Sequence, residues 1–121
     1  IESRGFVFAS AVSYLLKKPF IMLRKKNKLP AETYSVDFEL EYGTATIEVH
    51  KDSIDKGDSV LIIDDLIATG GTATAAAKLV EISGGKIEAF VFAINLFDLG
   101  GSDNLVKKGY KIENLMNFPG H

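Results

Sequence analysis

The chain contains no cysteine, so it can form neither a disulfide nor a thiolate metal site. It also lacks any apolar run near the roughly 20 residues that a membrane-spanning helix needs. No basic stretch followed by an apolar block and a cleavage site opens the sequence. These absences favour a cytoplasmic protein with no membrane partner.

Charge of one sign is not in excess either. Fourteen Lys and Arg face 16 Asp and Glu, mixed along the chain, for a formal net charge of -2 at pH 7. Bulk charge therefore gives no reason to expect nucleic-acid binding. With 121 residues and 46% hydrophobic content, we expect one domain over residues 1–121, because a domain of this size buries roughly two thirds of its unfolded surface.

Residues 60–72 organise the rest of the chain. Residues 60–63 are four branched apolar side chains in a row, typical of a strand covered on both faces in the middle of a parallel sheet. Asp64 and Asp65 follow at its carboxyl end, where ligands of open α/β sheets gather. Ionised carboxylates accept hydrogen bonds, so this pair suits the two vicinal hydroxyls of a ribose.

The loop that follows the two acids has the composition of an anion site. It consists of Ala68, Thr69, Gly70, Gly71 and Thr72. The glycines let backbone N–H groups converge, and a helix starting near Thr72 adds unpaired N–H groups and a favourable dipole. Taken singly, the acids fit a turn with a helix cap and the glycines a tight loop. In this order they favour a sugar-phosphate site, and neither a P-loop nor a dinucleotide Gly-x-Gly-x-x-Gly motif is present.

A second anion site is predicted near the start of the chain. Residues 5–16 have the apolar spacing of a helix, so Ser3, Arg4 and Gly5 lie at its amino terminus. Taken by itself, Arg4 would be an ordinary solvated residue. The first two residues resemble the end of a strand, from which we expect the natural amino terminus to lie further upstream.

Residues 24–50 are predicted to form a basic loop and a flap, preceded by a short strand. Residues 20–23 are typical of a short apolar strand, and the basic run 24–30 of a loop. Residues 35–40 and 44–50 alternate apolar and polar side chains around a turn at Tyr42, as in an antiparallel hairpin with one wet face. His50 falls on its polar register and is predicted to be a surface residue. From composition alone, the basic run is equally well explained as solvated surface.

The remaining sequence predicts a β-α-β unit. A helix from residue 72 points Ala76, Leu79 and Val80 inward and stops at the glycines of 83–85, and residues 87–96 read as another covered strand. A loop with a short helix at 100–108 and an edge strand at 110–115 follow. We therefore expect an α/β fold with a central, mainly parallel sheet flanked by helices, a right-handed crossover and an antiparallel flap.

Residues 60–72 resemble the phosphoribosyl diphosphate motif of the type I phosphoribosyltransferases. Residues 2–6, 24–32 and 40–43 are similar, in order and spacing, to the adenine phosphoribosyltransferase family. This resemblance implies a Rossmann-like core with a flap within residues 24–50, Mg²⁺ as cofactor and a homodimer. It also implies a reaction of purine salvage, in which adenine and phosphoribosyl diphosphate give AMP and pyrophosphate.

The same resemblance implies a role for each matching residue. It implies that Asp64, Asp65 and the loop 68–72 bind the 5′-phosphate and the ribose, and that the two acids also bind magnesium, directly or through water. Pyrophosphate is assigned to six residues of the first loop and the basic run: Ser3, Arg4, Gly5, Arg24, Lys25 and Lys28. The catalytic residues implied are Glu41, Tyr42 and Arg24, with Glu41 handling a proton on the purine.

Two other functions stay open at this point. One is a noncatalytic regulator that senses phosphoribosyl diphosphate or a nucleotide on the same fold. The other is a phosphoribosyltransferase for another base, such as hypoxanthine, xanthine or orotate. In the family, an upstream segment forms part of the adenine pocket, so base specificity depends on the resemblance, and Glu41 is equally well explained as a solvent-facing residue.

Overall fold

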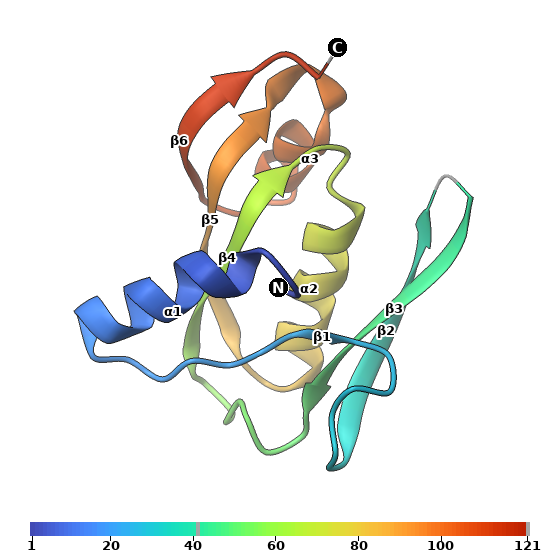
Figure 1. Ribbon diagram of the computed structural model, residues 1–121, viewed down its shortest axis with the longest axis vertical. Coiled ribbons are helices and arrows are strands. Elements are labelled where there is room, and N and C mark those ends of the chain that lie inside the picture. Colours follow the sequence, from blue (N-terminus) through green and yellow to red (C-terminus); the bar gives the residue numbers. More distant parts are fainter. Residues whose placement is uncertain (41, 121) are drawn as a thin grey trace.

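The computed structural model describes residues 1–40 and 42–120 as two sheets and three α-helices (Figure 1). In chain order the elements are α1 (Gly5–Leu16), β1 (Arg24–Lys25), β2 (Thr33–Leu40), β3 (Gly43–His50), β4 (Ser59–Ile67), α2 (Gly71–Ile82), β5 (Lys86–Leu96), the short 3₁₀ helix η1 (Phe97–Leu99), α3 (Gly101–Lys107) and β6 (Ile112–Phe118). No helix in this described part is long and apolar enough to cross a membrane.

One sheet is parallel, with the strand order β4-β5-β6, as the β-α-β pattern predicted. The prediction that residues 60–63 lie in the middle of this sheet is wrong for the described residues. There β4 has β5 as its single neighbouring strand, and Leu61 is 41% exposed. A run of branched apolar residues indicates a strand, and it does not distinguish an inner strand from an edge strand.

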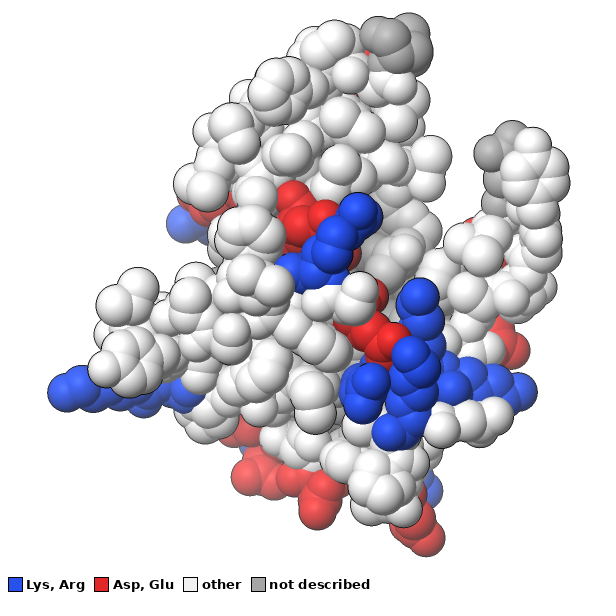
Figure 2. Space-filling view, viewed as in Figure 1, with Lys and Arg blue, Asp and Glu red and all other residues white. Residues whose placement is uncertain are grey.

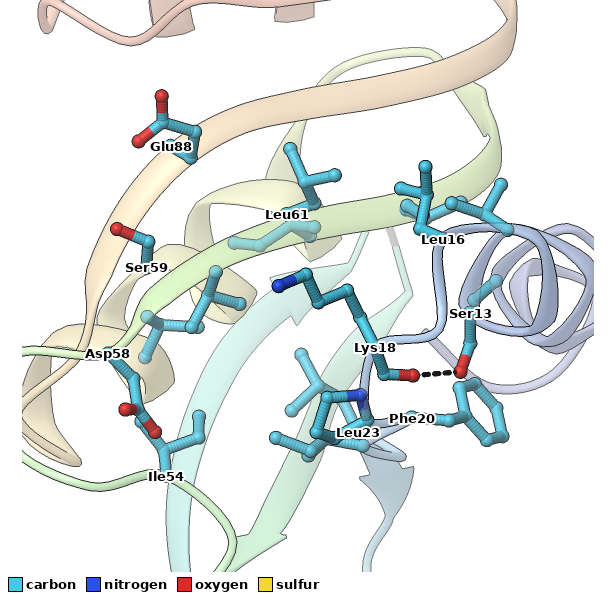
Figure 3. Close-up of a pocket in the computed structure, with 18 of the residues that line it drawn as sticks. Ser13, Leu16, Lys18, Phe20, Leu23, Ile54, Asp58, Ser59, Leu61 and Glu88 are labelled. Atoms are coloured by element: carbon cyan, nitrogen blue, oxygen red, sulfur yellow. Dashed lines mark hydrogen bonds between the residues drawn. The ribbon is translucent and has the colours of Figure 1, made fainter.

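Beside β4 lies an apolar hollow of about 490 Å³ between α1, residues 18–23 and the strand. Figure 3 shows Leu16, Phe20, Leu23 and Leu61 around it, with the Ser13 hydroxyl bonded to the Lys18 carbonyl oxygen at its margin. This hollow accounts for the exposure of Leu61, and it is lined by different residues from the polar cleft described below.

Helix α2 lies between the parallel sheet and the hairpin and contacts β2, β3, β4 and β5. Ala76, Leu79 and Val80 are buried at 0–1% exposure, and Lys78 and Glu81 face outward, as predicted. The buried alanines let the helix approach both sheets closely, because a small side chain separates backbones least. This packing fixes the start of α2 relative to the end of β4.

The second sheet is antiparallel, with the order β1-β3-β2, and β2 and β3 form the predicted hairpin. The strand predicted at 20–23 is absent; β1 forms instead at Arg24–Lys25, opposite Ile47 and Glu48 of β3. Leu23 is buried by its side chain while its carbonyl oxygen accepts the Glu2 N–H. Of this stretch Leu23 belongs to the core and Ile21 packs against it, whereas Phe20 and Met22 are each 39% exposed, so the apolar run does not mark a paired strand.

Three smaller predictions change in detail. Strand β4 continues through Asp64 and Asp65 to Ile67, because its long partner β5 keeps pairing with it. Strand β6 begins and ends later than the predicted 110–115, while α3 confirms the short helix. His50 is half-buried and not a surface residue; its Nε2 is buried with no hydrogen-bond partner among the described residues.

Candidate active site

A polar cleft of about 890 Å³ opens at the carboxyl end of β4. Four segments form its walls: the turn before α1, the end of β4 with the loop into α2, the end of β2 next to the hairpin turn, and β1. Their lining residues include Ser3 and Arg4, the acids of β4, residues 68–73, residues 38–40 and Lys25. Every segment predicted to bind a phosphate or ribose group therefore contributes to one hollow.

The first turn of α1 packs directly on the acid pair. A Cβ atom at Gly5 would lie 2.8 Å from Asp64 Oδ1 and 2.9 Å from the Ile63 carbonyl oxygen, so no side chain fits there. Arg4 Nε lies 2.8 Å from Asp65 Oδ2, and the Arg4 side chain is 79% exposed. The first anion-binding loop consequently packs on the two acids, at the same edge of the sheet as the loop 68–72 that follows them.

The loop 68–72 turns into α2 through a left-handed glycine. Gly70 has φ 90°, a conformation that other residues adopt at a cost, and Gly71 begins the helix. The first N–H groups of a helix have no partner within it, and here they border the cleft. Phe38 and Glu39, near the turn end of β2, approach Gly71 on the outside. The loop therefore presents backbone donors and threonine hydroxyls to an anion.

The two acids differ in their electrostatic environment. Burial raises the pKa of Asp64 to about 6, and the neighbouring Asp65 carboxylate adds to this, although the Asp65 N–H and the chain's amino group favour the ionised form. Asp65 instead faces the Arg4 guanidinium. A carboxyl with a pKa near 6 exchanges its proton close to neutral pH, which is common for groups in functional sites.

The basic run is held by a residue whose role the sequence did not reveal. Glu2 accepts hydrogen bonds from Arg24 Nε at 3.1 Å, from Lys28 Nζ at 2.7 Å and from the Lys25 N–H at 3.0 Å, and its side chain is 5% exposed. Burial by itself raises the pKa of Glu2, but these three donors outweigh it and lower the pKa to about 2. Near the middle of the face in Figure 2, positively charged side chains lie against carboxylates.

Of the three residues of the basic run assigned to pyrophosphate, Lys25 lines the cleft, while Arg24 and Lys28 are bound to Glu2. The sequence signal for this arrangement was a single acid directly before Ser3, between a predicted strand end and a loop.

Tyr42, a predicted catalytic residue of the flap, is not among the residues that line the cleft. Tyr42 lies at the hairpin turn and is 92% exposed. Glu41 lies outside the described residues. In the hairpin, the end of β2 next to the turn, residues 38–40, borders the cleft, and the opposite end near Thr33 and His50 does not line it.

The acid pair fits a magnesium ion. Mg²⁺ prefers oxygen ligands and is commonly held by one or two carboxylates together with water and substrate phosphate. Asp64 and Asp65 supply such oxygens at the cleft. No group of three or more metal-ligating side chains occurs in the part of the chain that the structure describes, so substrate and water would complete the coordination of an ion bound here.

Comparison with known proteins agrees with this geometry. The family model described as "Phosphoribosyl transferase domain" matches residues 1–119. The curated adenine phosphoribosyltransferase of Pelagibacter ubique (strain HTCC1062) is 92% identical over 121 residues, which are 100% of this chain and 69% of that protein. A crystal structure of adenine phosphoribosyltransferase from Thermoanaerobacter pseudethanolicus superimposes with a TM-score of 0.92 at 48% identity, over 97% of this chain and 67% of that one.

The enzyme of Saccharomyces cerevisiae, solved with an imino-altritol 1,6-bisphosphate and adenine, gives a TM-score of 0.88 at 38% identity over 94% of this chain and 63% of that one. The chain thus spans about two thirds of the length of these relatives. Because the family match covers almost every residue and the curated relative differs at few positions, the chain belongs to the phosphoribosyltransferase family and, within it, to the adenine phosphoribosyltransferases.

Proposed function

We propose that the protein transfers the 5-phosphoribosyl group of phosphoribosyl diphosphate to adenine, giving AMP and pyrophosphate in purine salvage. The observation that carries this proposal is the polar cleft, where two anion-binding loops flank a pair of carboxylates. A donor substrate with a phosphate at one end, a diphosphate at the other and a ribose between them matches that order. The yeast relative's ligands, a bisphosphate and adenine, have the same chemical character.

Each part of the cleft has a role in this reaction. The 5′-phosphate binds the donors of the loop 68–72, the ribose hydroxyls donate to Asp64 and Asp65, and the pyrophosphate binds Ser3, Arg4 and Gly5. When pyrophosphate leaves, negative charge grows on it. Arg4 and Lys25 are placed to stabilise that charge, which lowers the barrier if the contact is stronger in the transition state than in the bound substrate.

Asp64 and Asp65 are the residues that would hold Mg²⁺. When bound, the ion neutralises charge on the diphosphate and the developing pyrophosphate. The raised pKa of Asp64 means that this side chain must lose its proton before it serves as a full metal ligand or as an acceptor for two hydroxyls.

The hairpin acts as the flap over the reacting atoms. The end of β2 next to its turn already borders the cleft, so closure brings the neighbouring Glu41 and Tyr42 toward the sugar and excludes water, which would otherwise hydrolyse the activated ribose. We assign Glu41 to proton handling on the purine and Arg24 to the leaving group. A cytoplasmic location stays a prediction from composition.

A transfer assay on the full-length protein tests the proposed function. Adenine is expected to accept the phosphoribosyl group, whereas hypoxanthine, xanthine and orotate are not. The measurement is radiolabelled base incorporated into nucleotide, with each base supplied separately. Binding of phosphoribosyl diphosphate without transfer to any base would indicate the regulator instead, and transfer to one of the other bases would contradict the assignment of adenine.

The pKa of Asp64 predicts a pH dependence of AMP affinity. Ionised Asp64 accepts the ribose hydroxyls, so affinity should fall as the pH drops through about 6, by about tenfold at pH 5. The stability of the fold depends on pH in the opposite direction. Because the pKa of Asp64 is raised from its ordinary 3.8, proton binding stabilises the folded state, fully below about pH 4, and this stabilisation is lost as the pH rises through about 6.

Because a phosphate also titrates near pH 6, the readout is the difference between variants. Asp64→Asn should remove the excess pH slope of the AMP dissociation constant, while Asp103→Asn, an exposed acid of α3, should retain it. Isothermal titration calorimetry from pH 5 to pH 8 gives both slopes. Parallel slopes in wild type and Asp64→Asn would show that the acid does not titrate in the site.

Arg24 and Thr72 should separate transition-state stabilisation from product binding. AMP carries no pyrophosphate, so Arg24→Ala should lower kcat/KM for phosphoribosyl diphosphate and leave the AMP dissociation constant nearly unchanged. The loss of a charge-assisted hydrogen bond, roughly 1.5–3 kcal/mol, corresponds to about ten- to hundredfold in rate. Thr72→Ala should weaken AMP itself. Lys26→Ala, at an exposed neighbouring residue, is the control. Equal effects of Arg24→Ala and Lys26→Ala would show that the basic run is only solvated surface.

We also propose that the protein is a homodimer. Val7, Tyr14 and Leu15 of α1 are 70–84% exposed, which is unusual for a set of apolar side chains on one helix and is typical of a surface that another subunit covers. Sedimentation equilibrium of the full-length protein should give twice the chain mass at micromolar concentration. A monomer at that concentration would refute the dimer, and it would leave the proposed reaction unaffected.

A further inference from the structure

The phosphate loop 68–72 rests on a segment that takes no part in lining the cleft. This backing segment, residues 100–102, leaves η1 and begins α3. In Figure 1, α3 lies next to the turn between β4 and α2. We propose that the backing segment and Asn95 position the phosphate loop and thereby set the affinity for the 5′-phosphate; this inference rests on the proposed function.

The two segments touch backbone to backbone. The Gly101 N–H donates to the Ala68 carbonyl oxygen at 3.2 Å. A Cβ atom at Gly101 would lie 2.4 Å from that oxygen, 2.8 Å from the Gly70 nitrogen and 2.8 Å from the Thr69 carbonyl carbon. In the other direction, a Cβ at Gly70 would lie 3.0 Å from the Gly101 Cα. Both glycines are needed for this approach, and any side chain at 101 must push the loop itself, because the atoms it meets are main-chain atoms.

A buried side-chain pair holds the backing segment in place. Asn95, the next-to-last residue of β5, is 7% exposed and donates from Nδ2 to the Ser102 hydroxyl at 3.1 Å. Ser102 is 8% exposed. Asn95 also lies opposite Ile67, the last residue of β4. Its Oδ1 is buried without a hydrogen-bond partner among the described residues, so Ser102 is the partner that orients this amide there. The pair therefore connects the end of β4 to the start of α3.

This placement matters because the phosphate loop binds with its backbone. Donors on separate side chains can each adjust, whereas successive N–H groups of one loop move together, so a shift of the loop misdirects all of them at once. Gly101, Ser102 and Asn95 are absent from the cleft wall, so they act through the loop and are positioning residues. The pyrophosphate loop, residues 3–5, packs on Asp64 and Ile63 and pairs with Asp65, whereas the backing segment packs on residues 68–70. A change in the backing segment should thus affect one end of the substrate and not the other.

The first test is Gly101→Ala in the full-length protein, with binding measured by titration calorimetry. The dissociation constant of ribose 5-phosphate should rise about ten- to hundredfold, the range for losing one charge-assisted hydrogen bond. That of magnesium pyrophosphate should change less than about twofold. Gly109→Ala is the matched control at the other end of α3: its φ of 92° strains an added side chain, but a Cβ there meets nothing within 4 Å. It should lower the melting temperature and leave both dissociation constants unchanged.

The second test uses Ser102, which stays informative if Gly101→Ala does not fold. Ser102→Ala removes the acceptor of the Asn95 amide and should weaken ribose 5-phosphate selectively, raising KM for phosphoribosyl diphosphate more than it lowers kcat. Ser102→Thr keeps the hydroxyl and should recover most of the affinity. A merely structural role would lower the melting temperature of both variants without this selectivity.

The outcomes separate this inference from the proposed function. Unchanged ribose 5-phosphate affinity in both Gly101→Ala and Ser102→Ala, or an equal loss for ribose 5-phosphate and pyrophosphate, would overturn the positioning role. Selective loss in a protein that does not transfer adenine would support the positioning role and reject the proposed reaction. Failure of the wild type to bind ribose 5-phosphate would overturn both.

Discussion

The close approach of main chains at the carboxyl end of β4 is the constraint on which the site depends. Gly5 meets the main chain and side chain of the acid pair, and Gly70 and Gly101 meet each other, at distances that leave no room for a Cβ atom. Backbone N–H groups can converge on an anion only where side chains do not hold the segments apart. The glycines therefore bring both anion-binding loops to the acids, and the packing of α2 between the two sheets keeps this edge in place.

Electrostatics divides the acid pair into two different groups. Asp65 has a cation at 2.8 Å, whereas Asp64 is half-buried beside another carboxylate, and its pKa is raised to about 6. Two adjacent carboxylates away from bulk water repel each other, so an arrangement that keeps one proton near neutral pH costs less than one that keeps two full charges. A substrate that brings a divalent cation and hydroxyl donors removes that repulsion, so ionisation of Asp64 and substrate binding favour each other.

The sequence predicted what local chemistry determines. The motif at 60–72, helix α1 and helix α2 follow from residues that are neighbours along the chain: branched apolar runs, acids, glycines and helical spacing. What it did not predict depends on partners far away in sequence. Several contacts join segments more than 20 residues apart: those of Glu2 with Arg24 and Lys28, and that of Gly101 with the phosphate loop. The edge position of β4 and the absence of a strand at 20–23 likewise depend on which distant segments pair. Spacing and composition carry no information on such pairs without the fold.

The ion pairs of Glu2 with Arg24 and Lys28 affect how a leaving pyrophosphate can bind these two cations. Arg24 and Lys28 are already paired with a carboxylate that is 5% exposed and has a pKa of about 2, so Glu2 stays charged at any physiological pH. Pyrophosphate must either share these cations or displace Glu2, and displacement leaves a buried charge without a partner, at a cost of several kcal/mol. Sharing is therefore favoured: Glu2 orients Arg24 beside the pyrophosphate loop in advance, and a donor that is already oriented loses little entropy when the charge develops.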